Sequence, residues 1–130
     1  MKKALIPLVA LFLWTACQES LEDRCAREAK EYTAKHCPVQ VAQDIIFDSM
    51  FFDRSSHLIS YAYTVSGILD DAEVIRRNAP REHLLMEVKN STQLKLYKEA
   101  GYSFRYIYYS AQKRGTQLFS ATFHQSDYEN

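Results

Sequence analysis

The sequence predicts an α+β domain, in which helices pack on one face of a four-stranded antiparallel sheet to form a two-layer sandwich. A charged helical segment precedes the first strand-like segment, the strand-like segments form two consecutive pairs, and a longer helical region separates the pairs. The expected order is therefore α-β-β-α-β-β. Because 47% of the residues are hydrophobic and 13% are aromatic, the chain can build a core, and disorder is excluded.

The first helix is predicted over residues 21–36, which are rich in the good helix formers Glu, Ala, Arg and Lys. Its apolar stripe recurs at spacings of three and four and comprises Leu21, Cys25, Ala29, Tyr32 and His36. Pro38 ends the helix, because a proline pushes the preceding residue out of the α region.

Cys25 and Cys37 lie 12 residues apart. If one helix joins them, their Cα atoms are ~18 Å apart, well beyond the ~7 Å limit for a disulfide. We therefore expect two unpaired thiols, with Cys37 buried. Adjacent residues on a helix do not face each other, so His36 and Cys37 are not expected to form a catalytic pair.

The first pair of strands is predicted over residues 44–52 and 58–66, joined by the polar turn 53–56 and closed by Gly67. The second strand of the pair alternates cleanly, which indicates a half-buried strand. Its two faces carry Ile59, Tyr61, Tyr63 and Val65 on one side, and Ser60, Ala62, Thr64 and Ser66 on the other.

A helical region follows, with a short helix over residues 70–77 and a second start at Asn78-Ala79-Pro80, where Asn78 would cap and Pro80 would fill the first turn. We expect a kink near residues 90–92 and an end at Gly101 in the C′ role. The second strand pair covers residues 102–111 and 116–123, with Phe104, Tyr106 and Tyr108 on one face. The polar tail from residue 124 is expected to be loose.

The pattern of the N-terminal residues is typical of an export signal. Lys2 and Lys3 precede the uncharged residues 4–14, a run in the range of a signal-peptide core. As a helix it spans ~16 Å, too short for ~30 Å of bilayer hydrocarbon. The following Leu13-Trp14-Thr15-Ala16-Cys17 resembles a lipobox, the processing site of bacterial lipoproteins.

That resemblance implies cleavage before Cys17 and acylation of its sulfur. It divides the chain into a signal peptide (1–16), a lipidated tether (17–20) and a single α+β domain (21–130). Two or three acyl chains hold a protein firmly on a membrane, and Gln18 after the cysteine suits the outer membrane. The alternative is an ordinary secretory signal. Without residues 1–16 the chain has 14 basic and 16 acidic residues, so a nucleic-acid partner is not expected.

The mature chain resembles a broad group of uncharacterised small bacterial lipoproteins with a cystatin-like, half-wrapped sheet. The resemblance rests on the element order and on Cys37-Pro38, Asp48-Ser49, Tyr61-Ala62-Tyr63, Gly101 and Arg105-Tyr106-Ile107-Tyr108. It implies a fold and brings no activity.

No motif specifies a chemistry. The four histidines His36, His57, His83 and His124 include no i, i+4 pair, so we expect no metal site and no cofactor. Asp44 and Asp48 would share one face of a strand, as an acid-base pair or, as we favour, as a solvated pair that blocks sheet aggregation. We expect no enzymatic activity.

The predicted strands hold six of the nine tyrosines, a residue enriched at binding surfaces. If helices cover one face of the sheet, the open face is a candidate binding surface. It would carry Ser60, Ala62, Thr64, Arg105, Ile107 and Tyr109. The expected function is a non-enzymatic cell-envelope module that binds a protein or glycan. The alternative is a cystatin-like inhibitor of a secreted or periplasmic protease, which rests on fold analogy alone.

Overall fold

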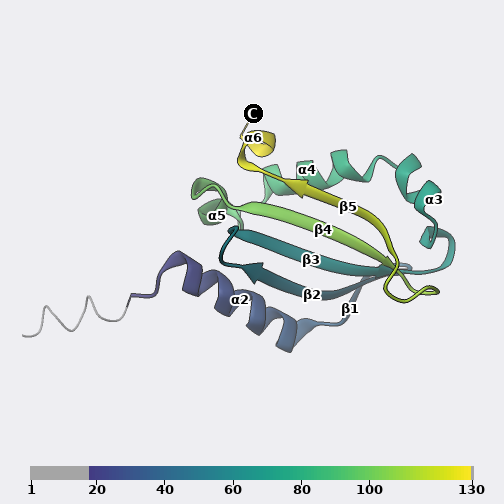
Figure 1. The fold of residues 1–130 in the computed structure, drawn as a ribbon, viewed down its shortest axis with the longest axis horizontal. Coiled ribbons are helices and arrows are strands. Elements are labelled where there is room, and N and C mark those ends of the chain that lie inside the picture. Colours follow the sequence, from purple (N-terminus) through teal and green to yellow (C-terminus); the bar gives the residue numbers. More distant parts are fainter. Residues whose placement is uncertain (1–17, 130) are drawn as a thin grey trace, which may run out of the picture.

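The structure, a computed structural model, describes residues 18–129 (Figure 1). The predicted signal peptide and Cys17 lie outside these residues. The elements, in chain order, are α2 (Leu21–His36), β1 (Val39–Ala42), β2 (Ile45–Asp53), β3 (Leu58–Val65), the 3-10 helix η2 (Gly67–Leu69), α3 (Ala72–Arg77), α4 (Pro80–Asn90), α5 (Lys95–Glu99), β4 (Ser103–Ser110), β5 (Gln117–Phe123) and α6 (Gln125–Tyr128). Among residues 18–129, no helix combines the length and apolar composition needed to cross a bilayer.

The α+β class is confirmed, but the predicted four-stranded antiparallel sheet is wrong in detail. The sheet has five strands in the order β1-β2-β3-β4-β5, and β3 and β4 are parallel while the other neighbours are antiparallel. The chain between β3 and β4 passes through η2, α3, α4 and α5. A crossover of that length returns the chain to the starting end of β3, which makes a parallel pair possible.

Strand β1 was not predicted, and its presence places Asp44 in a turn where a strand residue was expected. This four-residue strand pairs with the start of β2, with Val39 opposite Phe47 and Ala42 opposite Ile45. Asp44 lies in the connecting turn with a φ of 65°, and Asp48 lies at an irregularity in the pairing of β2 with β3. The two aspartates therefore do not share one face of a strand as expected.

Helix α2 begins and ends where the sequence predicts. The Ser20 hydroxyl caps it by accepting a hydrogen bond from the Asp23 backbone amide at 3.0 Å, which satisfies one of the unpaired amides of a first helical turn. Within residues 18–129, Cys25 and Cys37 are both free, as expected. The buried one is Cys25 on the helix, while Cys37 is partly exposed, because residue 37 lies past the last helical turn.

The crossover differs from expectation at its caps. The Asn78 amide Nδ2 donates to the Val74 carbonyl at 2.8 Å, so Asn78 ends α3 and does not cap α4. Ala79 precedes the first-turn Pro80 in a left-handed conformation. The expected break falls between Asn90 and Lys95, and Gly101 takes the expected left-handed conformation, with a φ of 80°.

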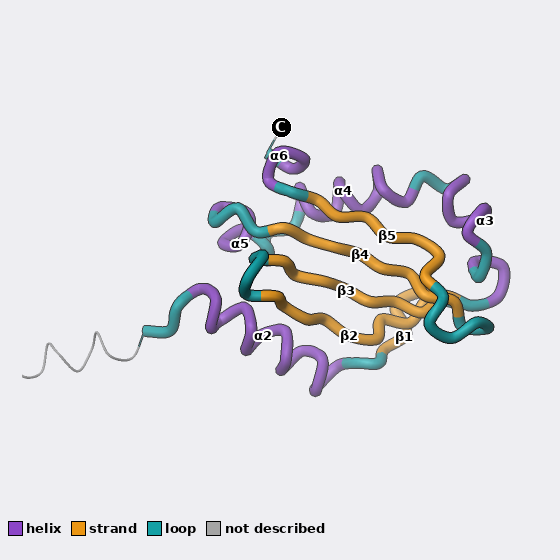
Figure 2. Tube along the Cα trace, in the orientation of Figure 1, coloured by secondary structure: helices purple, strands orange, loops and turns teal. Residues whose placement is uncertain are grey.

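The core lies on one face of the sheet. That face contributes Ile59, Phe104, Tyr106, Ala121 and Phe123, and the helices α2, α4, α5 and α6 contribute Cys25, Leu84, Val88, Tyr97 and Tyr128. Figures 1 and 2 show α2 running along β2 and α4 along β5, at opposite edges of the sheet. The expected loose tail is wrong for Tyr128, which is buried in the short helix α6.

Helix α2 also blocks the edge of β2 beyond its pairing with β1. The Thr33 hydroxyl donates to the Met50 carbonyl and accepts from the Met50 amide, both at 2.9 Å. A free strand edge is a template for unwanted strand pairing. Thr33 therefore occupies the backbone groups that an added strand would use.

Thr33→Val is expected to lower the free energy of unfolding by about 1–2 kcal/mol, because the variant keeps the shape of the side chain and loses both hydrogen bonds. Equilibrium urea unfolding followed by circular dichroism measures the change. Thr33→Ser keeps the hydroxyl and should stay within about 0.5 kcal/mol of the original. Equal stability of the valine variant and the original chain would show that these bonds do not hold α2 on the edge.

Candidate functional site: a groove floored by tyrosines

A groove of about 530 Å³ lies over β2 and β3, between α2 and the segment that leads into α5. Its floor is Phe47, Met50, Tyr61 and Tyr63; the α2 wall is Glu28, Glu31, Tyr32, Lys35 and His36, continued by Val41; and the opposite wall is Gln93, Leu94 and Tyr97. This volume is in the range of small-molecule and peptide side-chain sites. We call this feature the groove.

The groove exists because the helices are held at the two edges of the sheet. Thr33 ties α2 to β2. On the other side, the Arg81 guanidinium of α4 lies 4.8 Å from the ring centre of Phe123 and donates to the Thr122 carbonyl of β5 at 3.5 Å. Ile59 at the start of β3 is fully buried, whereas Tyr61 and Tyr63 farther along β3 are only half-buried. The helices thus leave the middle of β3 partly uncovered, since Val65 at its end is buried again.

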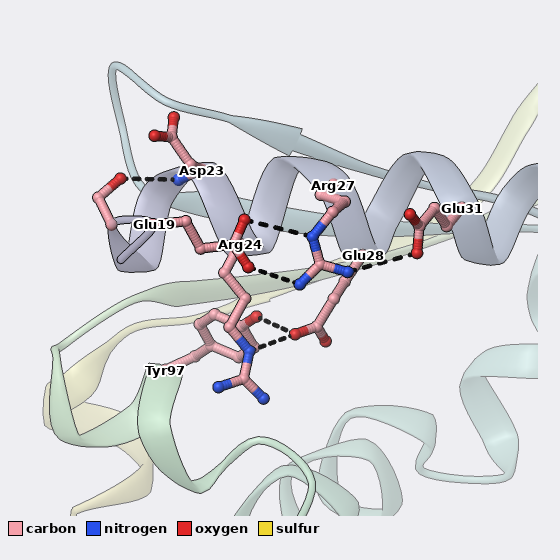
Figure 3. Close-up of polar contacts among 8 residues, drawn as sticks. Glu19, Asp23, Arg24, Arg27, Glu28, Glu31 and Tyr97 are labelled. Carbon is pink, nitrogen blue, oxygen red and sulfur yellow. Dashed lines mark hydrogen bonds and ion pairs between the residues drawn. The ribbon is translucent and has the colours of Figure 1, made fainter. Parts of the chain in front are cut away.

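One end of the groove is closed by a contact between α2 and α5. The Tyr97 hydroxyl donates to the Glu28 carboxylate at 3.1 Å, and the Arg24 guanidinium binds the same oxygen at 2.5 Å. Figure 3 shows these contacts converging on Glu28. Behind them, burial, followed by the charge of Glu28, raises the pKa of the Cys25 thiol to about 12. This thiol is protonated at neutral pH and is a poor nucleophile.

The same helix binds the start of the described chain. The Arg27 guanidinium contacts the Glu19 carboxylate at 2.6 Å and the Glu31 carboxylate at 3.4 Å (Figure 3). The hydrogen bond from Arg27 lowers the pKa of Glu19. Part of the predicted tether, residues 17–20, is therefore in contact with α2.

The tyrosine hydroxyls on the floor are open to the groove. Within residues 18–129, every side-chain oxygen or nitrogen that is sealed from solvent has a hydrogen-bond partner. The hydroxyls of Tyr61 and Tyr63 have no partner in this part of the chain, so both oxygens reach open space. Burial, followed by the phenol of Tyr106, raises their pKa above the ordinary 10.0. They are neutral hydroxyls that can donate a hydrogen bond at any physiological pH.

The floor rings pack on one another and leave few free faces. Phe47 and Tyr63 stack with their centres 4.9 Å apart, and Tyr61 stacks on Tyr106 at the same distance. Stacking of this kind consumes ring faces. What the floor offers to a ligand is mainly ring edges and hydroxyls.

The sequence-predicted face lies on the opposite side of the sheet, and the register brings its six residues together. Ser60 is opposite Arg105, Ala62 opposite Ile107 and Thr64 opposite Tyr109 across the β3–β4 pair. Three members of this set, Ser60, Ala62 and Ile107, are buried. The part that a ligand can reach is therefore reduced to Thr64, Arg105 and Tyr109.

Two of these three residues already have partners within the sheet. Thr64 donates to the Asp48 carboxylate at 2.5 Å, and Arg105 donates to the Thr122 hydroxyl at 3.2 Å. A hollow of about 430 Å³ at one end of this face includes Thr64 and Tyr109, with Arg114 from the β4–β5 turn. The rest of its lining is Ser110, Ala111 and Gly115. The hollow offers one aromatic ring, that of Tyr109, whereas six aromatic rings line the groove when His36 is included.

The other chemistry-bearing residues are not assembled into a site. In the described part of the chain, no three His, Cys, Asp or Glu residues are placed to hold a metal ion. Asp44 lies beside Ser66, at 3.4 Å, away from Asp48 and its partner Thr64. The His36 ring contacts Tyr32, with centres 4.8 Å apart, and burial raises the pKa of Cys37, so this adjacent pair contains no activated thiol.

Sequence reasoning missed the groove because it assigned the face with Tyr61 and Tyr63 wholly to the core. One signal was available. Four tyrosines alternate on that face, at positions 61, 63, 106 and 108, and a buried tyrosine hydroxyl needs a partner. A predicted core face that carries several tyrosine hydroxyls without evident hydrogen-bond partners indicates a face that remains partly accessible to water.

The fold is similar to that of a solved protein. A crystal structure from Pseudomonas aeruginosa, described as a "putative secreted protein", superposes with a TM-score of 0.67 at 19% sequence identity, covering 85% of this chain and 98% of that one. No protein in the curated collection of sequences matches this chain.

A family model matches most of the chain as well. It is described as "Domain of unknown function (DUF8479)" and matches residues 20–119. That range begins at the Ser20 cap of α2 and ends within β5, so it contains both walls and the floor of the groove. The chain therefore belongs to the DUF8479 family.

Proposed function

We propose that this protein is an exported, lipid-anchored binding module without catalytic activity, which holds a protein or glycan partner in the groove. The observation that carries the proposal is the pair of half-buried tyrosines, Tyr61 and Tyr63, whose hydroxyls have no partner among residues 18–129. Because solvent reaches these hydroxyls, a ligand in the groove can replace the water that they bind and form hydrogen bonds with them.

The surroundings of the groove support binding and not catalysis. A nucleophile or general base needs a shifted pKa and an orienting partner. The Cys25 thiol is protonated, with a pKa of about 12, and the Glu28 carboxylate is held by Arg24 and Tyr97. The groove thus combines aromatic edges with fixed polar groups, as binding sites do.

A groove-filling substitution tests the site. Gln93 is an exposed lining residue, so Gln93→Trp places an indole over the groove without disturbing the core. Ser120→Trp, at an exposed position of β5 on the other face, is the matched control. The proteins are screened on printed arrays of bacterial envelope glycans and blocked synthetic peptides. The original chain and Ser120→Trp should bind the same ligands, and Gln93→Trp should lose them. If Gln93→Trp retains every ligand, the groove is not the site.

The anchor is tested separately with Cys17→Ala. The lipobox-like segment and the export signal support acylation of this cysteine, and two or more acyl chains give firm membrane attachment. In cells fed an alkyne analogue of palmitate, the original chain should be labelled and should enter the detergent phase on Triton extraction. Cys17→Ala should be unlabelled. An unlabelled original chain in the aqueous phase would favour an ordinary secreted protein.

A further inference from the structure

Very few residues separate the proposed acylation site from the folded domain. Gln18 directly follows Cys17 in the sequence. Both carboxylate oxygens of Glu19 contact the Arg27 guanidinium, at 2.6 and 3.3 Å, and the Ser20 hydroxyl caps α2. Because an extended chain advances at most ~3.6 Å per residue, the Cα atoms of Cys17 and Glu19 are at most ~7 Å apart.

This short connection limits the distance between the domain and a membrane. The headgroup region adds ~5–8 Å to each side of the hydrocarbon core, which is about the length of the connection. We propose that the domain stands on the headgroups of the bilayer that holds its own acyl chains, with the start of α2 against the membrane. This step rests on the acylation of Cys17 that is part of the proposed function.

The β2–β3 turn lies beside the start of α2 and belongs to the same surface. The Arg54 guanidinium contacts the Asp23 carboxylate at 2.6 Å, and the His57 ring lies 3.5 Å from the Glu22 carboxylate. Figure 1 shows this turn next to the first turns of α2, at the end of the domain where the described chain begins. We call residues 18–23 and 53–57 the contact surface.

The side chains of the contact surface suit headgroups and not hydrocarbon. Of the large apolar side chains that are exposed among residues 18–129, none lies in it. The hydrogen bond from Arg54 lowers the pKa of Asp23, and the hydroxyls of Ser55 and Ser56 lower the pKa of Asp53, so both carboxylates are ionised at neutral pH. A surface with charges of both signs complements zwitterionic headgroups, which carry a phosphate and an ammonium group.

The groove begins beyond the contact surface. Its α2 wall runs from Glu28 to His36, which lie ~10 and ~22 Å along the helix from Leu21. The bond from Tyr97 to Glu28 closes the end of the groove nearer to the contact surface, so a partner enters from the other side. With four residues of extended chain added, the far end of the wall is at most ~37 Å from Cys17. A bound partner is therefore one that reaches the membrane surface.

Quenching by spin-labelled headgroups tests this arrangement. The full acylated protein is placed in phosphatidylcholine nanodiscs, with or without a lipid that carries a TEMPO group on its headgroup. A thiol-reactive fluorophore is attached at Ser55→Cys, on the contact surface, or at Lys35→Cys, on the groove wall, each in a Cys37→Ser background. Cys25 is fully buried and is not labelled. Because Lys35 lies ~21 Å along α2 from its start, we expect the Ser55→Cys probe to be quenched at least about twofold more strongly.

A linker insertion is the matched control. About ten glycine and serine residues between Gln18 and Glu19 keep the acyl anchor and let the domain move ~17 Å away, so quenching of the Ser55→Cys probe should fall at least about twofold. Equal quenching of the two probes, or undiminished quenching with the linker, overturns the arrangement.

Intact mass separates the two ways in which the proposal can fail. A native chain without acyl groups contradicts the anchor in the proposed function and, with it, this arrangement. An acylated chain whose Ser55→Cys probe is not quenched overturns the contact surface alone and leaves the anchor and the groove in place.

Discussion

Replacing Tyr128 by alanine is expected to lower the free energy of unfolding by about 3–5 kcal/mol, the usual cost of deleting a large buried side chain. The ring of Tyr128 packs edge-on against Phe104, with centres 5.7 Å apart, and Phe104 is fully buried. The Tyr128 hydroxyl also donates to the Tyr102 carbonyl at 2.8 Å and lies 3.2 Å from the Lys98 carbonyl. Helix α6 is thus part of the core, although the sequence around it is polar.

Tyr128→Phe separates the two contributions, because it keeps the ring and removes only the hydroxyl. We expect it to cost about 1 kcal/mol. Urea unfolding of both variants, monitored by far-ultraviolet circular dichroism, gives the free energies of unfolding to be compared. An alanine variant that loses less than about 1 kcal/mol would mean that the C-terminal residues do not pack as described.

Alkaline unfolding is the second large expected effect. Burial raises the pKa of Tyr61, Tyr63 and Tyr106 above 10.0. In the unfolded chain these phenols lose their protons near pH ~10, whereas in the folded chain they retain them. Their contribution to stability is therefore complete below pH ~10 and is lost as the pH rises toward the folded-state pKa values. Three such groups give a slope of at most about 4 kcal/mol per pH unit.

Urea midpoints measured from about pH 9 to about pH 12 test this slope, with tyrosinate absorbance as the second signal. Tyr63→Phe should reduce the slope by about 1.4 kcal/mol per pH unit, because it removes one titrating group. Tyr109→Phe is the control, since Tyr109 lies on the other face. Tyrosines that ionise in the folded protein near pH ~10, without loss of stability, would contradict the burial described for the floor.

Local pattern predicted the elements well where it was strong. The spacing of Leu21, Cys25 and Ala29 located α2 to the residue, and the alternation around Tyr61 located β3 within one residue. The hydrophobic pattern did not predict the elements that are short. Strand β1 has four residues, all exposed, and α6 has only Tyr128 as a buried residue. Neither element therefore shows a hydrophobic periodicity in the sequence.

The order of strands is a longer-range property. Two hairpins separated by helices can be joined in one sheet through an antiparallel or a parallel pair of strands, and the residues within each strand are the same in both. The crossover from β3 to β4 decides between these arrangements, because it returns the chain so that β4 runs parallel to β3. The length of that connection can be read from the sequence, but its path over the sheet cannot.

The same limit applies to the site. Alternation correctly placed Ser60, Ala62 and Thr64 on one face and Tyr61 and Tyr63 on the other. It could not tell that α2 and α4 are held at the sheet edges, by Thr33 and by Arg81. Those two contacts leave the tyrosine face open, and they join residues far apart in the chain.

Tyrosine-selective 13C NMR of the full protein is the most direct measurement of which face binds the ligand. The Cζ resonances of Tyr61, Tyr63 and Tyr109 are assigned from the single Tyr→Phe variants, and a ligand identified on the glycan and peptide arrays is then added. Binding in the groove predicts that the Tyr61 and Tyr63 resonances shift together while Tyr109 stays in place. A shift of Tyr109 alone would contradict the groove and return the site to the opposite face of the sheet.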